Sequence, residues 1–180
     1  DAMLAHFADP AGGFWFTAEG LDPPLHRPKG FADEATPAGN GIAAQALGRL
    51  GWLLGETRYL EAAARAVSGG WPSLARAPHA HATMLTALEE YLHPPQVVII
   101  RGPQAEAQQW AEALAALYAP RRMVLAIPDD APDLPPALAS KAPRGGTVAY
   151  LCEGPSCSAP AGDLSRLVRL LRDGVGTRDA

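Results

Sequence analysis

Four polar residues lie close together in the loop that precedes the first strongly helical segment: Arg27, Lys29, Asp33 and Asn40. A carboxylate such as Asp33 can act as a general acid or base. Arg27 and Lys29 can anchor an anionic or hydroxylated ligand, and the Asn40 amide can donate hydrogen bonds to the hydroxyls of such a ligand and accept hydrogen bonds from them. These residue types predict a polar site with Asp33 as its catalytic residue and the other three as substrate-binding residues. The competing interpretation is structural, with Asn40 capping its helix and Arg27 paired with Asp33.

Three consecutive aromatic residues, Phe14, Trp15 and Phe16, precede this loop. Aromatic rings can stack on the apolar C–H faces of sugars, and Trp15 therefore joins the substrate-binding candidates. In an extended segment Trp15 points away from the side of Phe14 and Phe16, so one set faces a ligand while the other packs in the core. Core packing is the competing interpretation for these residues, because aromatic side chains bury a large apolar area.

A cysteine pair, Cys152 and Cys157, stands near the end of the chain. Its four-residue spacing is neither that of a thioredoxin-like redox pair nor half of a four-cysteine zinc site. A turn at Gly154-Pro155 can bring the sulfurs within disulfide reach, which would make the pair a redox switch. Two cysteines are too few for a disulfide framework, so we expect a reducing, cytoplasmic compartment and two packed, reduced thiols.

Neither a metal site nor a cofactor site is indicated. His79 and His81 form a His-x-His pair, but no further His or Cys lies near them in the sequence, and zinc normally takes three or four protein ligands. The turn Arg101-Gly102-Pro103 has one glycine, and its proline lacks a backbone donor that a phosphate cradle would use. We therefore expect no metal and no cofactor.

Composition excludes several classes of partner. The 180 residues include 15 basic and 19 acidic side chains. The net charge of −4 means that the chain has no excess positive charge to attract nucleic acid or an anionic membrane. Hydrophobic residues make up 48% of the chain, which argues against disorder, and no apolar run approaches the roughly 18 residues of a membrane span. The chain begins with Asp1 and not with Met, and we expect it to be a fragment.

The segment up to residue 93 has helical periodicity. Asn40 is a candidate N-cap for a helix over 41–54, and Gly55 stands where a C′ residue would end it. A second helical pattern begins at Glu56-Thr57 and stops at Ser68-Gly69-Gly70, which predicts a helical hairpin. A third pattern, from Met84 to Leu92, would begin a second hairpin. We take 1–93 as one domain.

After Pro94-Pro95 the pattern changes to short apolar runs that alternate with helical stretches. Strand, helix, strand predicts a right-handed parallel crossover, and a third strand and a last helix follow. The strands lack polar alternation, so both faces of the sheet should be covered. We take 96–180 as a small three-stranded α/β unit, with strands at 97–100, 123–127 and 147–151 and helical stripes at 110–118 and 164–171.

The order of several motifs is distinctive. Gly12-Gly13-Phe14-Trp15-Phe16 is followed by Asp33-Glu34-Ala35, by Pro37-Ala38-Gly39-Asn40, by the Pro94-Pro95 and VVII run, and by Cys152-Glu-Gly-Pro-Ser-Cys157. Over nearly its whole length the chain resembles the C-terminal quarter of large thioredoxin-domain-containing proteins of the spermatogenesis-associated type. The bacterial members of that family are often described as related to N-acylglucosamine 2-epimerases.

The resemblance implies a mainly α fold with an α/β tail. Residues 1–93 would be the last hairpins of an (α/α)6 toroid, as in six-hairpin glycosidases, and the whole protein would bind or process a carbohydrate. The alternative is a non-catalytic protein-interaction module in which the cysteines form a redox switch. The rest of the same polypeptide would be a partner in either case. Where the family usually reads Asp-Gly-Ala and Pro-Ser-Gly-Asn, this chain has Glu34 and Ala38, so any role of the Ser hydroxyl is lost.

Overall fold

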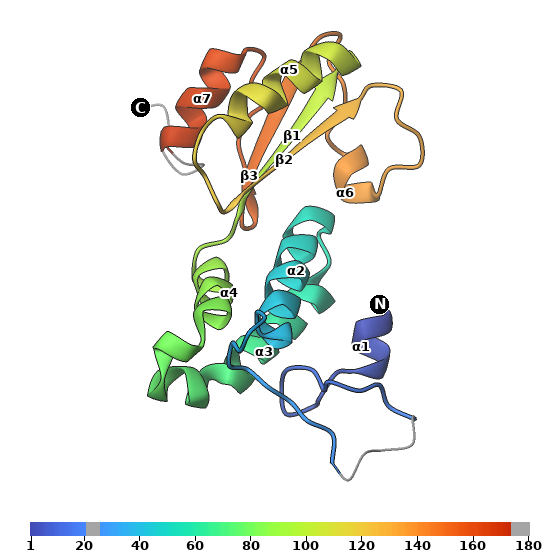
Figure 1. The fold of residues 1–180 in the computed structure, drawn as a ribbon. Coiled ribbons are helices and arrows are strands. Elements are labelled where there is room, and N and C mark those ends of the chain that lie inside the picture. The colour runs from blue at the N-terminus through green and yellow to red at the C-terminus, as the bar shows by residue number, and fades with distance from the viewer. Residues whose placement is uncertain (21–25, 174–180) are drawn as a thin grey trace. The chain divides into compact units, whose positions relative to one another are not determined.

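The structure is a computed structural model that describes residues 1–20 and 26–173. The chain divides into two compact units. The first comprises Asp1–Gly51 and Glu56–His93, and the second comprises Trp52–Gly55 and the chain from Pro94 onward (Figure 1). None of the described helices combines the length and the apolar character that a membrane crossing requires.

The first unit is helical. It contains α1 (Ala2–His6), most of α2 (Gly39–Leu54), α3 (Thr57–Arg76), the 3-10 turn η1 (Pro78–Ala80) and α4 (Ala82–Leu92). The helix predicted at 41–54 and the one at the Met84 to Leu92 stripe are confirmed. Only Gly55 and Glu56 separate α2 from α3, and Gly55 has the positive φ of 70° that ends a helix well.

Small residues let the helices of this unit approach closely. Its core consists of Phe14 from the N-terminal loop with alanine, leucine and valine side chains of α2, α3 and α4, namely Ala43, Ala44, Leu47, Ala62, Ala63, Ala66, Val67 and Ala87. A Cβ at Gly51 would lie 2.5 Å from Leu60 Cδ2, so a larger residue there would force α2 and α3 apart.

The prediction that the second helix ends at residues 68–70 is wrong, because α3 continues through Gly69, Gly70 and Pro72. Tertiary packing explains the continuation. A Cβ at Gly69 would lie 3.0 Å from the Gly12 carbonyl oxygen, and one at Gly70 would meet Met84 and Phe31. The glycines therefore allow loop residues to rest on the helix, and this packing outweighs their weak helix propensity.

The second unit is a mixed sheet covered by helices. Its elements are β1 (Gln96–Gly102), α5 (Gln104–Ala115), β2 (Arg122–Pro128), α6 (Pro136–Ala139), β3 (Val148–Glu153), β4 (Ser156–Cys157) and α7 (Leu164–Asp173). The strand order is β2-β1-β3-β4. β1 and β2 are parallel and joined through α5, as predicted, while β3 is antiparallel to β1 and to β4.

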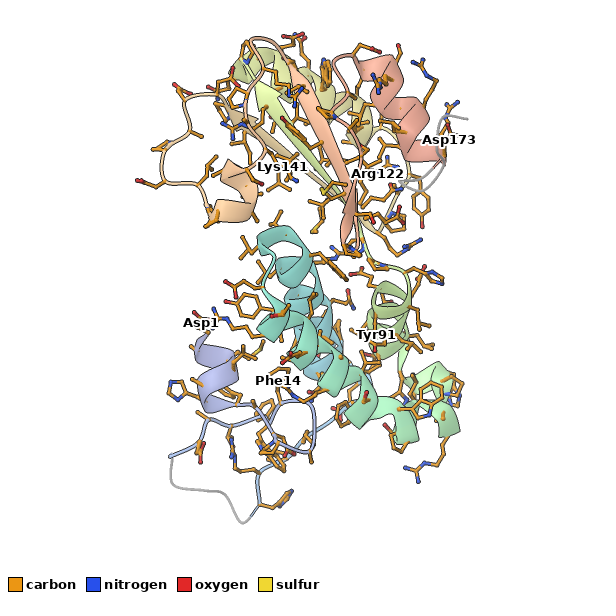
Figure 2. All side chains as sticks on the ribbon, turned by 180° about the vertical axis from the view of Figure 1, so that it is seen from behind. Asp1, Phe14, Tyr91, Arg122, Lys141 and Asp173 are labelled. Atoms are coloured by element: carbon orange, nitrogen blue, oxygen red, sulfur yellow. A yellow bond between two sulfur atoms is a disulfide. The ribbon has the colours of Figure 1, made fainter. Side chains whose placement is uncertain are left out.

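Both faces of this sheet are buried, as the absence of polar alternation predicts. Val98 and Ile100 of β1 pack with residues of α5 and α7, whereas Val97 and Ile99 pack on the opposite face with Leu138 of α6. The two-residue period of a strand places successive side chains of β1 on opposite faces (side chains are drawn in Figure 2). The sheet therefore has a core on each side.

The predicted fold class is wrong. The described residues form seven α-helices and a four-stranded mixed sheet, with no ring of helical hairpins among residues 1–20 and 26–173. Periodicity identified the longer helices but missed α1 and α6 and ended α3 too early. A helical stripe also carries no information about whether successive hairpins close into a toroid. The three-stranded prediction also missed β4, because two residues are too few to show a strand pattern.

Candidate functional site

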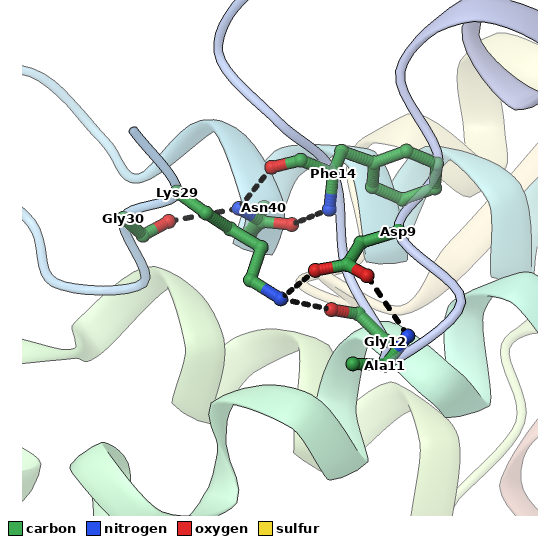
Figure 3. Close-up of polar contacts among 7 residues, drawn as sticks. All are labelled: Asp9, Ala11, Gly12, Phe14, Lys29, Gly30 and Asn40. Atoms are coloured by element: carbon green, nitrogen blue, oxygen red, sulfur yellow. Dashed lines mark hydrogen bonds and ion pairs between the residues drawn. The ribbon is translucent and has the colours of Figure 1, made fainter. Parts of the chain in front are cut away.

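Asn40 is the centre of a buried hydrogen-bond network (Figure 3). Its Oδ1 accepts a hydrogen bond from the Phe14 N–H at 2.6 Å, and its Nδ2 donates to the carbonyl oxygens of Phe14 at 3.0 Å and Gly30 at 2.8 Å. The residue is 4% exposed. The amide thus joins two separate loop segments to the first turn of α2, and these bonds use both of its polar atoms.

Lys29 binds within the same loop network. Its ammonium forms an ion pair with Asp9 and donates to the Gly12 carbonyl oxygen at 2.9 Å (Figure 3). The hydrogen bond from Lys29, together with one from the Ala11 N–H, holds the pKa of the Asp9 carboxyl below its ordinary value. Lys29 therefore holds the N-terminal loop together, as Asn40 does.

The Asp33 carboxylate lies at the beginnings of two helices. Oδ1 accepts from the Ala38 N–H, just before α2, at 2.7 Å, and Oδ2 accepts from the Thr83 N–H, in the first turn of α4, at 2.9 Å. Hydrogen bonds from the side chain and backbone of Thr83, and from Ala38, lower the pKa of Asp33. A carboxylate held ionised in this way by helix N–H groups acts as a structural cap. Neither Arg27 nor Lys29 pairs with it among the described ion pairs.

Arg27 and Trp15 form a small cationic and aromatic group with Lys29. The Arg27 guanidinium donates to the Thr17 carbonyl oxygen at 2.7 Å and lies 5.3 Å from the centre of the Trp15 ring. The Lys29 ammonium lies 5.0 Å from the same ring centre. Such cation–π contacts fix the orientation of the indole at a partly exposed position.

An open cavity of about 620 Å³ lies in the first unit beside the aromatic residues. Its volume is within the range of small-molecule sites. Of the predicted site residues, Trp15 and Asn40 line it, while Arg27, Lys29 and Asp33 do not. The remaining lining residues come from α1, the loops and the first turns of α2: Met3, Phe7, Phe14, Phe16, Pro28, Gly30, Ala32, Glu34, Thr36, Pro37, Ala38, Gly39 and Ala43.

The aromatic residues do not alternate as an extended segment would require. Phe14 is 7% exposed and packs in the core, whereas Phe16 is 81% exposed at the cavity. The segment is a series of bends in which only Phe14 makes an isolated bridge, with Ala8. Because the backbone bends after Phe14, the two phenylalanines have different surroundings, and Phe16 is the ring with a free face.

Glu34 is the acidic residue that lines the cavity. It is exposed, and within the part of the chain that the structure describes its carboxylate makes no hydrogen bond or ion pair. Of the other carboxylates that the sequence offers for sugar chemistry, Glu19 is exposed outside the cavity, and Asp22 lies outside the described residues. Glu34 and Thr36 are thus the polar side chains that remain available here.

The His-x-His pair has separate surroundings for its two rings. His81 is buried, and its Nδ1 lies 2.8 Å from the Ala77 carbonyl oxygen, whereas His79 is exposed in η1. Among the described residues no group of three or more His, Cys, Asp or Glu side chains is placed to hold a metal ion.

Cys152 and Cys157 form a disulfide, so the expectation of two reduced thiols is wrong. The physical reason is register. The cysteines are direct cross-strand partners in the β3–β4 hairpin, with Cα atoms 4.0 Å apart, and Gly154, at φ 57°, forms the first position of its two-residue turn. The turn noticed in the sequence at Gly154-Pro155 is therefore enough to bring the sulfurs together.

Sequence reasoning missed Lys141, whose ammonium lies 3.5 Å from Cys157 Sγ. No spacing rule connects a lysine in a loop to a cysteine sixteen residues later. It also missed Phe16, Glu34 and Thr36 as the free groups of the cavity. Their exposure depends on which loop residues the Asn40 network holds, and sequence alone does not show this.

Comparisons with known proteins do not assign the chain to a family. No protein-family model matches it, and neither does any curated protein.

Proposed function

We propose that the first unit binds a carbohydrate in the cavity beside Phe16, and that the chain is the C-terminal portion of a cytoplasmic thioredoxin-domain-containing protein of the kind it resembles. The observation that carries the proposal is the cavity of about 620 Å³, with the exposed aromatic ring of Phe16 and the free carboxylate of Glu34 at its wall.

The lining chemistry supports a sugar ligand. Phe16 offers a free aromatic face, and the Trp15 ring beside it is held by two cations. Glu34 accepts hydrogen bonds from sugar hydroxyls, and the Thr36 hydroxyl both donates and accepts. Apolar walls with a few polar groups are typical of small-molecule sites.

Binding without bond cleavage fits the available groups better than catalysis does. Canonical glycoside hydrolysis uses two carboxylates. Glu34 is one, but the oxygens of Asp33 accept backbone hydrogen bonds from Ala38 and Thr83, and Asp33 does not line the cavity. Glu34, and not Asp33, is therefore the principal polar contact that we propose for the sugar.

A binding screen with amino sugars and oligosaccharides tests the proposal. Thermal shift identifies a ligand, and calorimetry measures its Kd for the unsubstituted chain and for Phe16→Ala. Loss of one stacking contact should raise the Kd by about tenfold. Tyr118→Ala is the matched control, since Tyr118 is 94% exposed in the second unit. If no sugar binds, or if both variants bind alike, the proposal is wrong.

A second candidate, an interaction module, is favoured by exposed apolar side chains on α4. Leu85 and Leu92, at 41% and 60% exposure, are seven residues apart and so lie on one side of the helix. We propose that an upstream part of the same polypeptide covers them. Hydrogen exchange in α4 should then slow in a longer version of the polypeptide that includes the upstream sequence. Unchanged exchange would exclude that partner.

A further inference from the structure

The disulfide links the edge strand β4 of the second unit's sheet to its neighbour β3. β4 is the last strand in the order β2-β1-β3-β4 and consists of Ser156 and Cys157 alone. Neither core cluster of the unit includes Ser156 or Cys157. Cleavage of the sulfur bond therefore releases the two-residue edge strand without removing a core residue.

The two cysteine residues differ in exposure. Cys157 is exposed on β4, whereas Cys152 is half-buried on β3 and packs beside the cluster that contains Val97 and Tyr150. Attack on a disulfide requires the incoming thiolate to reach one sulfur in line with the bond, so access decides which sulfur is attacked. We therefore take Cys157, the exposed cysteine, as the one that an external thiolate attacks.

A cation lies beside that same sulfur. The Lys141 ammonium is 3.5 Å from Cys157 Sγ and 5.8 Å from the centre of the Tyr150 ring (Lys141 is labelled in Figure 2). A neighbouring lysine stabilises a thiolate relative to a thiol. Lys141 therefore favours release of Cys157 as a thiolate when a mixed disulfide at Cys157 is resolved.

The loop that carries Lys141 is held in place by two further contacts. The Tyr150 hydroxyl donates to the Ala142 carbonyl oxygen at 2.7 Å. The guanidinium of Arg101, which is 3% exposed, donates to the Lys141 carbonyl oxygen at 3.4 Å and to the Pro128 carbonyl oxygen at 3.2 Å. The backbone beneath the ammonium is thus anchored to β1 and β3, on which the hairpin is built.

We propose that this hairpin is a thiol–disulfide exchange site for an external dithiol or disulfide, with Cys157 as the exchanging sulfur, Cys152 as the resolving sulfur and Lys141 as the cation that stabilises the Cys157 thiolate. The inference is independent of carbohydrate binding, because every group it uses belongs to the second unit.

Reduction by a dithiol proceeds in two displacements. One thiolate of the dithiol attacks Cys157 Sγ, the bond between the cysteine sulfurs breaks, and its electron pair leaves on Cys152, which takes a proton from solvent. The second thiolate of the dithiol then attacks the dithiol sulfur that is bonded to Cys157. This attack releases Cys157 as a thiolate beside Lys141. The hairpin gains two electrons, and the dithiol becomes a disulfide. Oxidation by an external disulfide is the reverse sequence.

Alkylation of the reduced chain by iodoacetamide tests the assignment of the two sulfurs. Cys152→Ser leaves only Cys157 to react, and Cys157→Ser leaves only Cys152. At pH 7 Cys157 should react about tenfold faster, and its rate should rise with pH through a pKa below the ordinary thiol value of about 8.5. Equal rates for the two variants would overturn the proposal.

Variants at Lys141 test the cation. In the Cys152→Ser background, Lys141→Gln should slow Cys157 alkylation at pH 7 several-fold and move its pKa upward, while Lys141→Arg should retain most of the rate. Arg144→Gln, which removes an exposed cation from the same loop, is the control and should have no effect. If Cys157 is alkylated equally fast with Gln and with Lys at position 141, Lys141 does not stabilise the thiolate.

A measurement without cysteine substitution guards against misfolded variants. The folded chain and its Lys141→Gln form are equilibrated with mixtures of reduced and oxidised dithiothreitol, and free thiols are counted by mass after trapping. The disulfide should open to two thiols and re-form reversibly. The Lys141→Gln chain should need a higher fraction of reduced dithiothreitol than the unsubstituted chain before its disulfide opens. A disulfide that resists dithiothreitol in the folded chain would contradict an exchange role.

Discussion

The loop before α2 and the cysteine hairpin differ in what their side chains leave available to a second molecule. Asn40 and Asp33 have the residue types of a sugar site, yet their polar atoms are used by backbone groups of the first unit. Cys157 is instead an exposed residue with a cation beside its sulfur. Residue type indicates which chemistry is possible, and the partners that the fold supplies decide whether it remains available.

The largest effect should come from Asn40→Ala. The substitution leaves the N–H and carbonyl oxygen of Phe14 and the Gly30 carbonyl oxygen without their partner inside the unit, and each unsatisfied buried group costs about 1–3 kcal/mol. We expect the free energy of unfolding to fall by about 3 kcal/mol or more in urea titration. Thr36→Ala, at an exposed cavity residue, is the control. A loss below about 1 kcal/mol would mean that Asn40 is not a structural residue. Its amide would then be available to a ligand, and the loop before α2 would not differ from the cysteine hairpin in this respect.

Reduction of the disulfide should have the next largest effect and should be confined to the second unit. The bond joins residues only five positions apart, and chain-entropy arguments for so short a ring give about 2 kcal/mol. Hydrogen exchange with and without reductant should show faster exchange in the β3–β4 hairpin and unchanged exchange in α3 and in residues 39–51 of α2, which belong to the first unit. The Cys152→Ser, Cys157→Ser double variant should not respond to reductant. A response in the helices of the first unit would show that the hairpin stabilises more than its own unit.

Secondary structure could be predicted from the sequence where local periodicity was strong. The helix around Leu47 and the buried strand of Val97 to Ile100 each carry a pattern that local geometry explains. Where packing between distant segments decides, prediction failed. α3 passes through Gly69 and Gly70 because Gly12 and Phe31 rest on it, and these contacts join parts of the chain tens of residues apart.

The sequence predicted the approximate location of the candidate site but not the residues that are available in it. The loop up to Asn40 does border a cavity, and Trp15 lines it. However, the free groups are Phe16 and Glu34, because neighbouring residues of the same types are used elsewhere: Phe14 fills the core and Asp33 caps helices. A sequence lists donors and acceptors, but their pairing follows from three-dimensional contacts.

Asp33→Asn should have a smaller effect of about 1 kcal/mol, since one hydrogen bond to a helix N-terminus is lost and the other is kept. The pKa of Asp33 is lower in the folded chain than in the unfolded one, so its contribution is present at neutral pH. The contribution should decrease as pH falls below about 4, because protonation then favours unfolding.

Urea titrations at pH 7 and at lower pH measure this linkage for Asp33. The stability difference between the unsubstituted chain and Asp33→Asn should narrow at the lower pH. A pH-independent difference, or none at pH 7, would show that the carboxylate is not the structural cap described above. Asp33 would then return as a candidate for ligand chemistry, and the contrast with the cysteine hairpin would weaken.

Glu34→Gln should have the smallest effect on stability and still change binding. Its exposed carboxylate makes no hydrogen bond or ion pair within the described residues, so the free energy of unfolding should stay within about 0.5 kcal/mol. If sugars bind in the cavity, the loss of a charged acceptor should weaken binding by about tenfold in calorimetry. Glu19→Gln removes the same charge from an exposed position of the same unit that does not line the cavity, and its Kd should be unchanged. Equal Kd values for the two variants would mean that the Glu34 carboxylate does not contact the ligand. Of the two regions compared, the cysteine hairpin would then be the one with a reactive group available to a second molecule.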